Sequence, residues 1–331
     1  MSKILVIFTG GTISMTIDAR LGAAVPSLSS SEILGMIKDI DEYGDIEVHN
    51  FGELPGPQMD PQKMMELSQL IQQKVAQDDI MGVIVTHGTD TLEETAYFLD
   101  LTIKTHKPIV VVGAMRNASE LGYDGPSNLA SAIVTVKSPQ SMGQGVLVVL
   151  NNEVNAAREV TKTNTLSLDT FKSVEFGPLG IVDNNEVLFF RERLHHGQIL
   201  VDHFVEEVYL LKSYAGMDRS LIDFLVEKGA KGIVIEAMGR GNLPPLAVDA
   251  IEDAIEKGCV VTIVSRCPSG RVLGTYGYDG GGKGIRDKGA FFGTNLNGQK
   301  TRIKLMLALA YTQDPEELRL IMESDDYTCM S

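Results

Sequence analysis

Residues 4–8 form an uninterrupted apolar run, ILVIF, that leads directly into TGGT at residues 9–12. Such a run predicts a strand buried on both faces, as in a parallel sheet. In open α/β sheets, ligands bind beyond the carboxyl ends of the strands, and paired glycines let the backbone approach them closely. Thr12 is therefore expected where chemistry can occur, although the same residues could form a tight turn that the Thr12 hydroxyl caps.

A second strand end carries a similar set of polar groups. Residues 82–85, GVIV, predict a strand, and HGTDT follows at residues 87–91. Thr91 and Glu94 match a capping box for a helix, with Asp90 placed to favour its positive end. Ligand binding is compatible with this capping, because a helix N-terminus beyond a sheet edge suits an anionic ligand or a developing oxyanion.

A third segment adds a lysine. The strand-like residues 146–150 are followed by REVTKTNT at residues 158–165, which places Lys162 among threonines. The motifs TGGTI, HGTDT and VTKTNT, in this order, strongly resemble those of the bacterial-type L-asparaginase family of threonine amidohydrolases, in its cytoplasmic type I-like form. The resemblance continues through residues 171–180 and GRGN at residues 239–242, and it covers nearly the whole chain.

This resemblance implies that Thr12 attacks the side-chain amide of L-asparagine and forms an acyl-enzyme with loss of ammonia. Thr89, Asp90 and Lys162 would handle the protons, since a threonine hydroxyl is inert at neutral pH without activation. Asp90 would also hold the substrate amino group. The implied substrate-binding residues are Gly11, Gly56, Pro57, Gln58, Gly88, Thr89, Asp90 and Asn242. No metal and no cofactor are expected.

Two positions depart from the pattern of that family. Its members usually bring a tyrosine close to the nucleophile on the lid that follows it, but no tyrosine occurs between Thr12 and Tyr43. The loop that holds the substrate carboxylate commonly carries a serine at the position of Gly56. The backbone N–H groups of Gly56 and Gln58 could bind the carboxylate instead.

The length of 331 residues suits two domains, since single hydrophobic cores stop growing at roughly 250–300 residues. Strand and helix patterns alternate through the first half, which indicates an α/β fold with a mostly parallel, doubly wound sheet. We expect a larger N-terminal catalytic α/β domain over residues 1–190, a linker over 191–207 and a smaller C-terminal α/β domain over 208–331.

Local patterns predict the elements around the first motif. Residues 15–28 lack a clear period and are expected to form a loop, which is a candidate lid because it follows the proposed nucleophile. SSSE at residues 29–32 matches a capping box for a helix through Ile40. Asp60 is expected to be the N-cap of a helix that reaches about Ala76.

Charge and composition exclude several classes of protein. The formal net charge of −15 argues against nucleic acid or an anionic membrane as the main partner. No apolar run approaches the length of a transmembrane helix, and the five apolar residues after Lys3 are too few for a signal-peptide core. Three cysteines without a CxxC spacing suggest neither a disulfide framework nor a cysteine metal site. We therefore expect a cytoplasmic protein.

Two further motifs are not expected to bind metal or phosphate. His195, His196 and His203 lack a carboxylate or cysteine at ligand spacing, and His87 is expected to be a hydrogen-bonded structural residue. GYDGGGKG at residues 277–284 resembles a phosphate-binding loop, but glycine replaces the required Ser or Thr. A flexible loop is expected there.

In the resembling family, the asparagine that matches Asn242 reaches the partner's site across a two-fold dimer. We therefore expect a homo-oligomer, either a dimer or a dimer of dimers. Two other functions remain open. The motifs are shared by the ammonia-generating subunit of the archaeal-type glutamyl-tRNA amidotransferase, which normally carries an extra N-terminal domain. Alternatively, the glycine-rich strand ends could belong to a non-catalytic sensor of amino acids or nucleotides.

Overall fold

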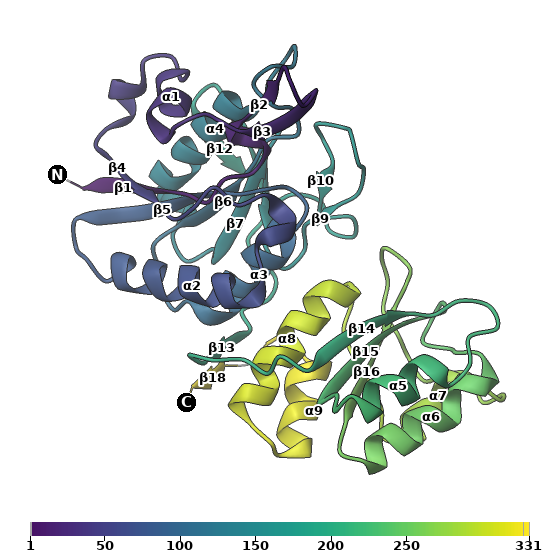
Figure 1. Ribbon diagram of the computed structural model, residues 1–331. Helices are drawn as coiled ribbons and strands as arrows, with labels where there is room; N and C mark the ends of the chain where they lie inside the picture. The colour runs from purple at the N-terminus through teal and green to yellow at the C-terminus, as the bar shows by residue number, and fades with distance from the viewer. Residues whose placement is uncertain (1, 327, 331) are drawn as a thin grey trace. The chain divides into compact units, whose positions relative to one another are not determined.

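The structure of the chain is a computed structural model that describes residues 2–326 and 328–330. The chain divides into two compact units, Met1–Leu194 and His195–Ser331. Each unit contains a β-sheet with helices packed on its faces (Figure 1). Among the described residues, no helix combines the length and the apolarity needed to cross a membrane.

The first unit is built on an eight-stranded sheet with the order β12-β11-β8-β7-β6-β5-β1-β4. Its strands are β1 (Lys3–Phe8), β4 (Ile46–Asn50), β5 (Ile80–Thr86), β6 (Ile109–Val112), β7 (Val146–Leu150), β8 (Glu153–Ala156), β11 (Gly180–Asp183) and β12 (Glu186–Phe189). The five strands from β4 to β7 in this order run parallel, and β8, β11 and β12 join as antiparallel neighbours. The expected mostly parallel sheet is confirmed.

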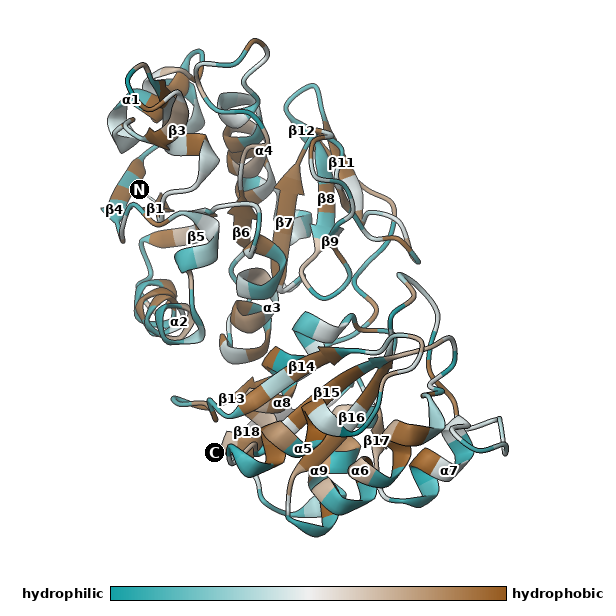
Figure 2. Cartoon of the chain, turned by 45° about the vertical axis from the view of Figure 1, so that its right-hand side comes forward, coloured by the Kyte–Doolittle hydropathy of each residue, from teal (hydrophilic) through white to brown (hydrophobic). Residues whose placement is uncertain are grey.

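Helices cover both faces of this sheet. They are α1 (Ser30–Gly35), α2 (Pro61–Val75), α3 (Leu92–Thr102) and α4 (Gly125–Lys137). Side chains alternate along β1, so that Ile4, Val6 and Phe8 share a core with α1 and α4, whereas Leu5 and Ile7 share a second core with α2 and α3. Both faces of the strand are buried, which is why its sequence is continuously apolar. Figure 2 shows the central strands β6 and β7 of the same sheet in the hydrophobic colour.

Two of the predicted helix starts are confirmed. Asp60 is the N-cap of α2, and its side chain accepts a hydrogen bond from the Lys63 amide. Ser29 and Glu32 form both hydrogen bonds of a capping box at α1. The expected extension of α1 through Ile40 is wrong. The helix ends at Gly35, and the chain then turns at Asp39, whose φ of 54° is left-handed, into the short helix η2 (Ile40–Tyr43).

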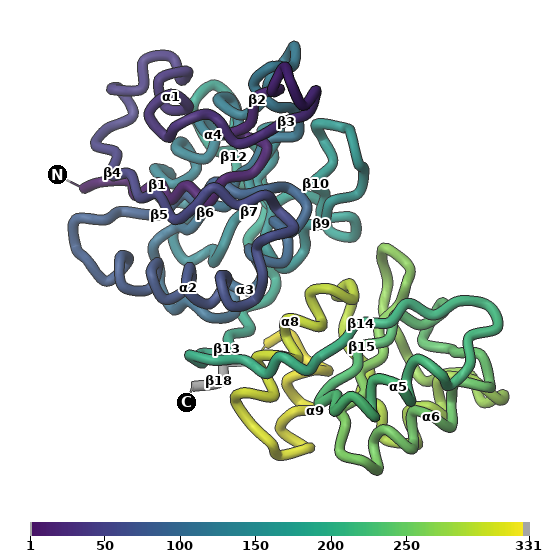
Figure 3. Tube along the Cα trace, viewed as in Figure 1, coloured from purple at the N-terminus to yellow at the C-terminus, as the bar shows by residue number. Residues whose placement is uncertain are grey.

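The segment expected to be an irregular loop after Thr12 is instead a β-hairpin. Strands β2 (Met15–Asp18) and β3 (Ala23–Pro26) pair in antiparallel register (Figure 3). The Asp18 carboxylate closes the connection by accepting hydrogen bonds from the Arg20 and Leu21 amides. Side chains fix this turn locally, which the mixed composition of the segment did not indicate.

The second unit contains a four-stranded parallel sheet with the order β14-β15-β16-β17. Its strands are β14 (Val208–Lys212), β15 (Gly232–Ala237), β16 (Val260–Ser265) and β17 (Phe291–Phe292). Its helices are α5 (Ser220–Glu227), α6 (Pro245–Glu256), α7 (Gly282–Asp287), α8 (Gly298–Tyr311) and α9 (Pro315–Glu323). A separate parallel pair joins β13 (Gln198–Leu200) to β18 (Thr328–Met330). The predicted α/β class of this half is confirmed.

Residues 277–284, where a flexible loop is expected, form a turn that leads into α7. The Gly281 amide donates to the Tyr278 carbonyl at 2.8 Å, and the Lys283 amide donates to the Tyr276 carbonyl at 3.1 Å. Residues 276–281 are therefore a compact turn, and the last glycines begin α7. The three consecutive glycines are buried, because their lack of side chains lets neighbouring backbone pack against them.

Candidate active site

Three neighbouring strands end at the same edge of the first sheet. β1 lies between β4 and β5, and all three run parallel. Their carboxyl ends are followed by residues 9–14, 51–58 and 87–91. The Leu54 amide donates to the Thr9 carbonyl at 2.7 Å, and the Thr9 hydroxyl donates to the Thr86 carbonyl at 2.7 Å. The motif segments therefore converge, as the strand-end rule predicts.

Three glycines bring the backbones of these segments into direct contact. A Cβ on Gly11 would lie 2.4 Å from the Gly88 nitrogen, and a Cβ on Gly88 would lie 2.6 Å from the Gly56 Cα. Either side chain would force the segments apart. Gly11 also has a φ of +87°, which residues with a Cβ rarely adopt. The predicted residues Gly11, Gly56 and Gly88 thus lie together.

Thr12 follows this contact and begins the short helix η1 (Thr12–Ser14). The turn is closed by Ser14, whose amide and hydroxyl both donate to the Gly11 carbonyl, at 3.0 and 2.9 Å. In the described part of the chain, the Thr12 hydroxyl has no hydrogen-bond partner, and the backbone N–H groups of Thr12 and Thr89 donate to no other group. The Thr12 hydroxyl and the N–H groups of Thr12 and Thr89 are therefore available to a ligand.

Lys162 comes from β9 (Thr161–Lys162), which pairs with β10 (Phe171–Lys172). Its ammonium donates to the Thr89 hydroxyl at 2.9 Å and to the Asp90 carboxylate at 2.8 Å. The side chain of Lys162 is 19% exposed and that of Asp90 is 61% exposed. Hydrogen bonds thus link Thr89, Asp90 and Lys162, three of the four predicted catalytic residues. Thr12 is linked to them only indirectly, because its neighbour Gly11 packs against Gly88.

The Gly56 loop is tied to the same site by Thr91. The Thr91 hydroxyl donates to the Gly56 carbonyl at 2.7 Å. The expected capping box at Thr91 is wrong for this reason: Thr91 is the N-cap of α3, but its side chain makes no capping hydrogen bond. A Cβ on Gly56 would lie 3.3 Å from the Asp90 Cβ, so the glycine allows a close approach. Pro57 and Gln58 lie beside it and are exposed.

His87 is buried behind these residues and only 1% exposed. Its Nδ1 lies 2.7 Å from the Gly88 carbonyl oxygen, and its Nε2 has no hydrogen-bond partner among the described residues. Burial lowers the pKa of His87 from 6.5 to about 4, and the hydrogen bond to Gly88 opposes this effect only in part. His87 is therefore a neutral, hydrogen-bonded residue near neutral pH, as expected.

Asn242 lies in the second unit, whereas the other predicted site residues lie in the first. It closes a tight turn after β15 by pairing with Met238. The Asn242 Oδ1 accepts a hydrogen bond from the Gly282 amide at 3.0 Å. Its amide nitrogen donates to no group in residues 2–326 or 328–330 and is available to a ligand.

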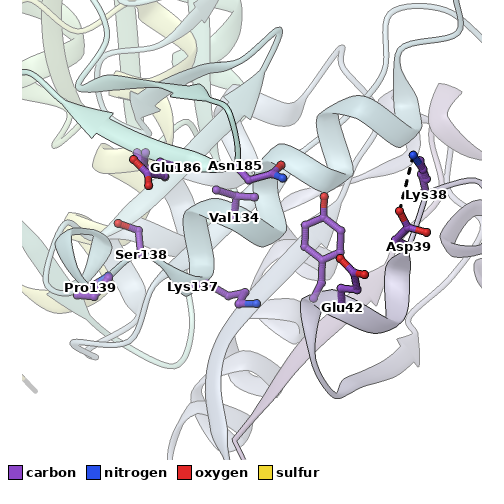
Figure 4. Close-up of a pocket in the computed structure, with 11 residues that line it drawn as sticks. Lys38, Asp39, Glu42, Val134, Lys137, Ser138, Pro139, Asn185 and Glu186 are labelled. Carbon is purple, nitrogen blue, oxygen red and sulfur yellow. Dashed lines mark ion pairs between the residues drawn. The ribbon is translucent and has the colours of Figure 1, made fainter.

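Another cavity lies in the first unit. This cavity of about 640 Å³ is lined by Lys38, Glu42 and Lys137 among others, with Lys38 paired to Asp39 at 3.9 Å (Figure 4). It contains none of the predicted site residues. No cluster of three or more His, Cys, Asp or Glu side chains among the described residues could hold a metal ion.

Sequence reasoning missed one residue that touches the nucleophile turn. The Tyr123 hydroxyl donates to the carbonyl of Ile13, the residue after Thr12, at 2.5 Å. Tyr123 lies 110 positions away, in the connection between β6 and α4. No local pattern links the two positions.

Comparison with known proteins gives matches over both units. A family model described as "Asparaginase, N-terminal" matches residues 3–195. A second model, "Glutaminase/Asparaginase C-terminal domain", matches residues 207–322. Together the two models cover most of the chain.

Individual relatives match over most of their length. L-asparaginase 2 of Bacillus subtilis (strain 168) is 37% identical over 332 residues, covering 96% of this chain and 85% of that protein. L-asparaginase 2 of Escherichia coli (strain K12) is 34% identical, covering 97% and 92%. The crystal structure of the probable cytoplasmic L-asparaginase from Campylobacter jejuni superposes with a TM-score of 0.87 at 32% identity, covering 97% of this chain and 99% of that one.

Proposed function

The chain belongs to the L-asparaginase family and is an asparaginase, an amidohydrolase, and from this premise we propose that Thr12 is the nucleophile that cleaves the side-chain amide of L-asparagine. One observation carries the proposal. Gly11, Gly88 and Gly56 pack backbone to backbone, and this packing brings the segment that carries Thr12 against the segment whose Thr89 and Asp90 bind Lys162.

Each step of the proposed reaction has a group available to it. The Thr12 oxygen bonds to the amide carbon while its proton passes through the Thr89 hydroxyl to Lys162, which accepts it in the neutral amine form. The N–H groups of Thr12 and Thr89 are free to stabilise the negative oxygen that develops. The carbon–nitrogen bond then breaks, and the nitrogen takes up a proton and leaves as ammonia. Water cleaves the resulting ester, which releases aspartate and restores the hydroxyl.

The same residues provide contacts for the rest of the substrate. The Asp90 carboxylate uses Oδ1 for Lys162, and its 61% exposure leaves the group open to the substrate amino group. The Gln58 N–H group, which was also expected to bind the substrate carboxylate, instead donates to the Pro55 carbonyl at 2.9 Å. The Gly56 N–H group would therefore bind the carboxylate, since Gly56 has no hydroxyl to do so. These two anchors fix the distance to Thr12, so one additional methylene in glutamine would misplace the carbonyl.

Ammonia release by the purified protein tests this function. We expect turnover of asparagine without any added protein or nucleic acid, with kcat/KM higher for asparagine than for glutamine. Turnover only with a partner protein would favour the amidotransferase subunit, and binding of asparagine without turnover would favour the sensor. Equal kcat/KM for the two substrates would contradict the proposed anchoring.

We further propose that a homo-oligomer, a dimer or a dimer of dimers, is the active form. The support is Asn242, whose amide nitrogen is free although the turn that carries it is fixed by the hydrogen bond to Gly282. In this proposal, the Asn242 amide completes the site of a partner subunit. A cytoplasmic location is supported by the likeness to a probable cytoplasmic enzyme, although "Probable L-asparaginase periplasmic" of Haemophilus influenzae is also 34% identical. Cell fractionation separates the two locations.

A further inference from the structure

A tyrosine from a distant loop holds the peptide that follows Thr12. The Tyr123 hydroxyl donates to the Ile13 carbonyl at 2.5 Å, and Ile13 itself is fully buried. On the other side of Thr12, Gly10 and Gly11 have φ values of +105° and +87°. The turn is therefore preceded by two glycines with positive φ, and the peptide that follows Thr12 is held by the Tyr123 hydroxyl.

Two more hydrogen bonds join the same loop to the chain after Thr12. The Ala118 amide donates to the Met15 carbonyl at 2.9 Å, and the Ile17 amide donates to the Ser119 hydroxyl at 3.0 Å. In Figure 3, residues 117–123 accordingly lie beside the β2–β3 hairpin. Together with the Tyr123 hydrogen bond, these contacts attach residues 13–17 to the loop of residues 117–123.

The base of this loop is itself fixed. The Asp124 carboxylate accepts hydrogen bonds from the Met115 amide at 3.1 Å and the Arg116 amide at 2.9 Å. Asn128 of α4 donates to the same carboxylate at 2.9 Å and to the Gly113 carbonyl at 3.0 Å. The loop is therefore anchored to the end of β6 and to α4. Its hydrogen bonds to residues 13–17 thus hold the turn after Thr12 in place relative to the sheet.

We propose that Tyr123 is a positioning residue, which acts through the Ile13 carbonyl to fix the direction of the Thr12 hydroxyl during attack. The inference rests on the proposed role of Thr12 as the nucleophile. A hydroxyl that must reach a carbonyl carbon along one direction loses rate when its backbone can rotate. Asp90 and Gly56, which would bind the substrate, lie on other segments, so substrate affinity does not depend on Tyr123.

Two features suit Tyr123 to this task. Burial raises the pKa of the Tyr123 hydroxyl, and the neighbouring Asp124 charge raises it further, so the group stays a neutral donor at any pH where the enzyme works. Gly125 makes space for the ring, because a Cβ there would lie 2.4 Å from the Tyr123 hydroxyl oxygen. Gly125→Ala would therefore displace the hydroxyl without removing it.

Tyr123→Phe removes the donor and keeps the ring. Loss of this partly buried hydrogen bond should lower kcat for asparagine about five- to tenfold, while KM changes less than about twofold. The shape of the pH–rate profile should not change, because Tyr123 donates a hydrogen bond and transfers no proton. Tyr43→Phe is the matched control: Tyr43 is also half-buried in the first unit, and its hydroxyl has no hydrogen-bond partner in the described chain. It should keep the kcat of the parent.

Gly125→Ala supplies a second test that does not delete the hydroxyl. It should lower kcat to a similar extent, and the double variant with Tyr123→Phe should lose no more than the larger single loss, because both changes remove one contact. Rates are compared per folded enzyme, well below the unfolding midpoint.

An unchanged kcat in Tyr123→Phe would overturn the positioning role, as would a loss confined to KM or to thermal stability. Disappearance of one limb of the pH–rate profile would also overturn it, because it would make Tyr123 a proton-transfer group. These outcomes are separate from failure of the proposed nucleophile, which is decided by Thr12→Ala alone. If Thr12→Ala keeps full turnover, the proposed function fails whatever Tyr123→Phe does.

Discussion

Gly11 packs its backbone directly against that of Gly88, so closely that a Cβ on Gly11 would lie 2.4 Å from the Gly88 nitrogen and 2.5 Å from its Cα. The two glycines come from the ends of β1 and β5, which are hydrogen-bonded neighbours in the sheet. This contact places the segment with Thr12 beside the segment with Thr89 and Asp90. It is therefore the structural basis of the candidate site.

Gly11→Ala should separate these two segments. We expect a fall in kcat/KM of at least about 100-fold, because a displacement of about 1 Å can cost that much. Gly229→Ala is the matched control, since Gly229 also has a positive φ, +93°, but nothing lies within 4 Å of its Cβ position. Both variants place a Cβ at a positive φ, with a conformational cost of roughly 1–3 kcal/mol, and both should be compared by unfolding and by turnover. Equal activity of the two would show that the close packing is not required.

Lys162→Met removes the ammonium that bridges Thr89 and Asp90 and keeps the aliphatic stem. We expect kcat to fall by at least the roughly 10²–10⁴-fold typical of a lost acid–base group. Lys172→Met, on the neighbouring strand β10, removes an ion pair with Glu153 at 2.6 Å and should leave kcat nearly unchanged. Steady-state kinetics of the two variants provide the comparison, and a parental kcat in Lys162→Met would make Lys162 a structural residue.

His87 should make folding sensitive to acid. Its pKa is about 4 in the folded chain and 6.5 in the unfolded chain, so the unfolded chain binds more protons between these values. Stability is therefore complete above pH 6.5 and falls as the pH drops toward 4, by about 3 kcal/mol from this residue. His87→Gln cannot take up the proton, so its free energy of unfolding, measured with urea, should fall less over the same range. Parallel pH dependences in the parent and the variant would rule out this contribution.

Much of the fold and of the site follows from short segments of sequence. The apolar run at residues 4–8 predicts a central strand because both of its faces are buried, and the glycines after it mark the sheet edge where ligands bind. Thr12 and Thr89 follow such strands, and parallel strands bring their carboxyl ends to one edge, so local patterns indicate their position. Lys162 lies in β9, after the antiparallel strand β8, and its selection depended on the resemblance of VTKTNT to the L-asparaginase family.

Long-range side-chain contacts could not be predicted in this way. Thr91 matches a capping box locally, but its hydroxyl binds Gly56, 35 positions away. Tyr123 reaches Ile13 across 110 positions. The sequence likewise did not predict the hairpin at residues 15–26. Its turn and its attachment depend on hydrogen bonds to the side chains of Asp18 and Ser119, and such contacts produce no apolar period in the sequence. Such partners are chosen by the folded topology and have no local signature.

Asn242 should complete the site of a partner subunit. Co-expression of a Thr12→Ala chain with an Asn242→Ala chain should restore activity, because a mixed dimer contains one site with both native residues. Each variant alone must first be shown to be severely impaired, and mixed dimers must be demonstrated with two different tags. Demonstrated mixed dimers without recovered activity would show that Asn242 does not act across subunits.

The role of Thr12 is the central claim, and ammonia release from asparagine by purified Thr12→Ala tests it most directly. The substitution removes only a hydroxyl that has no hydrogen-bond partner in the described chain, so the variant should fold and unfold like the parent. Turnover should be lost, because no other group is placed to form the acyl-enzyme. A folded Thr12→Ala protein that releases ammonia at the parental rate would contradict the account.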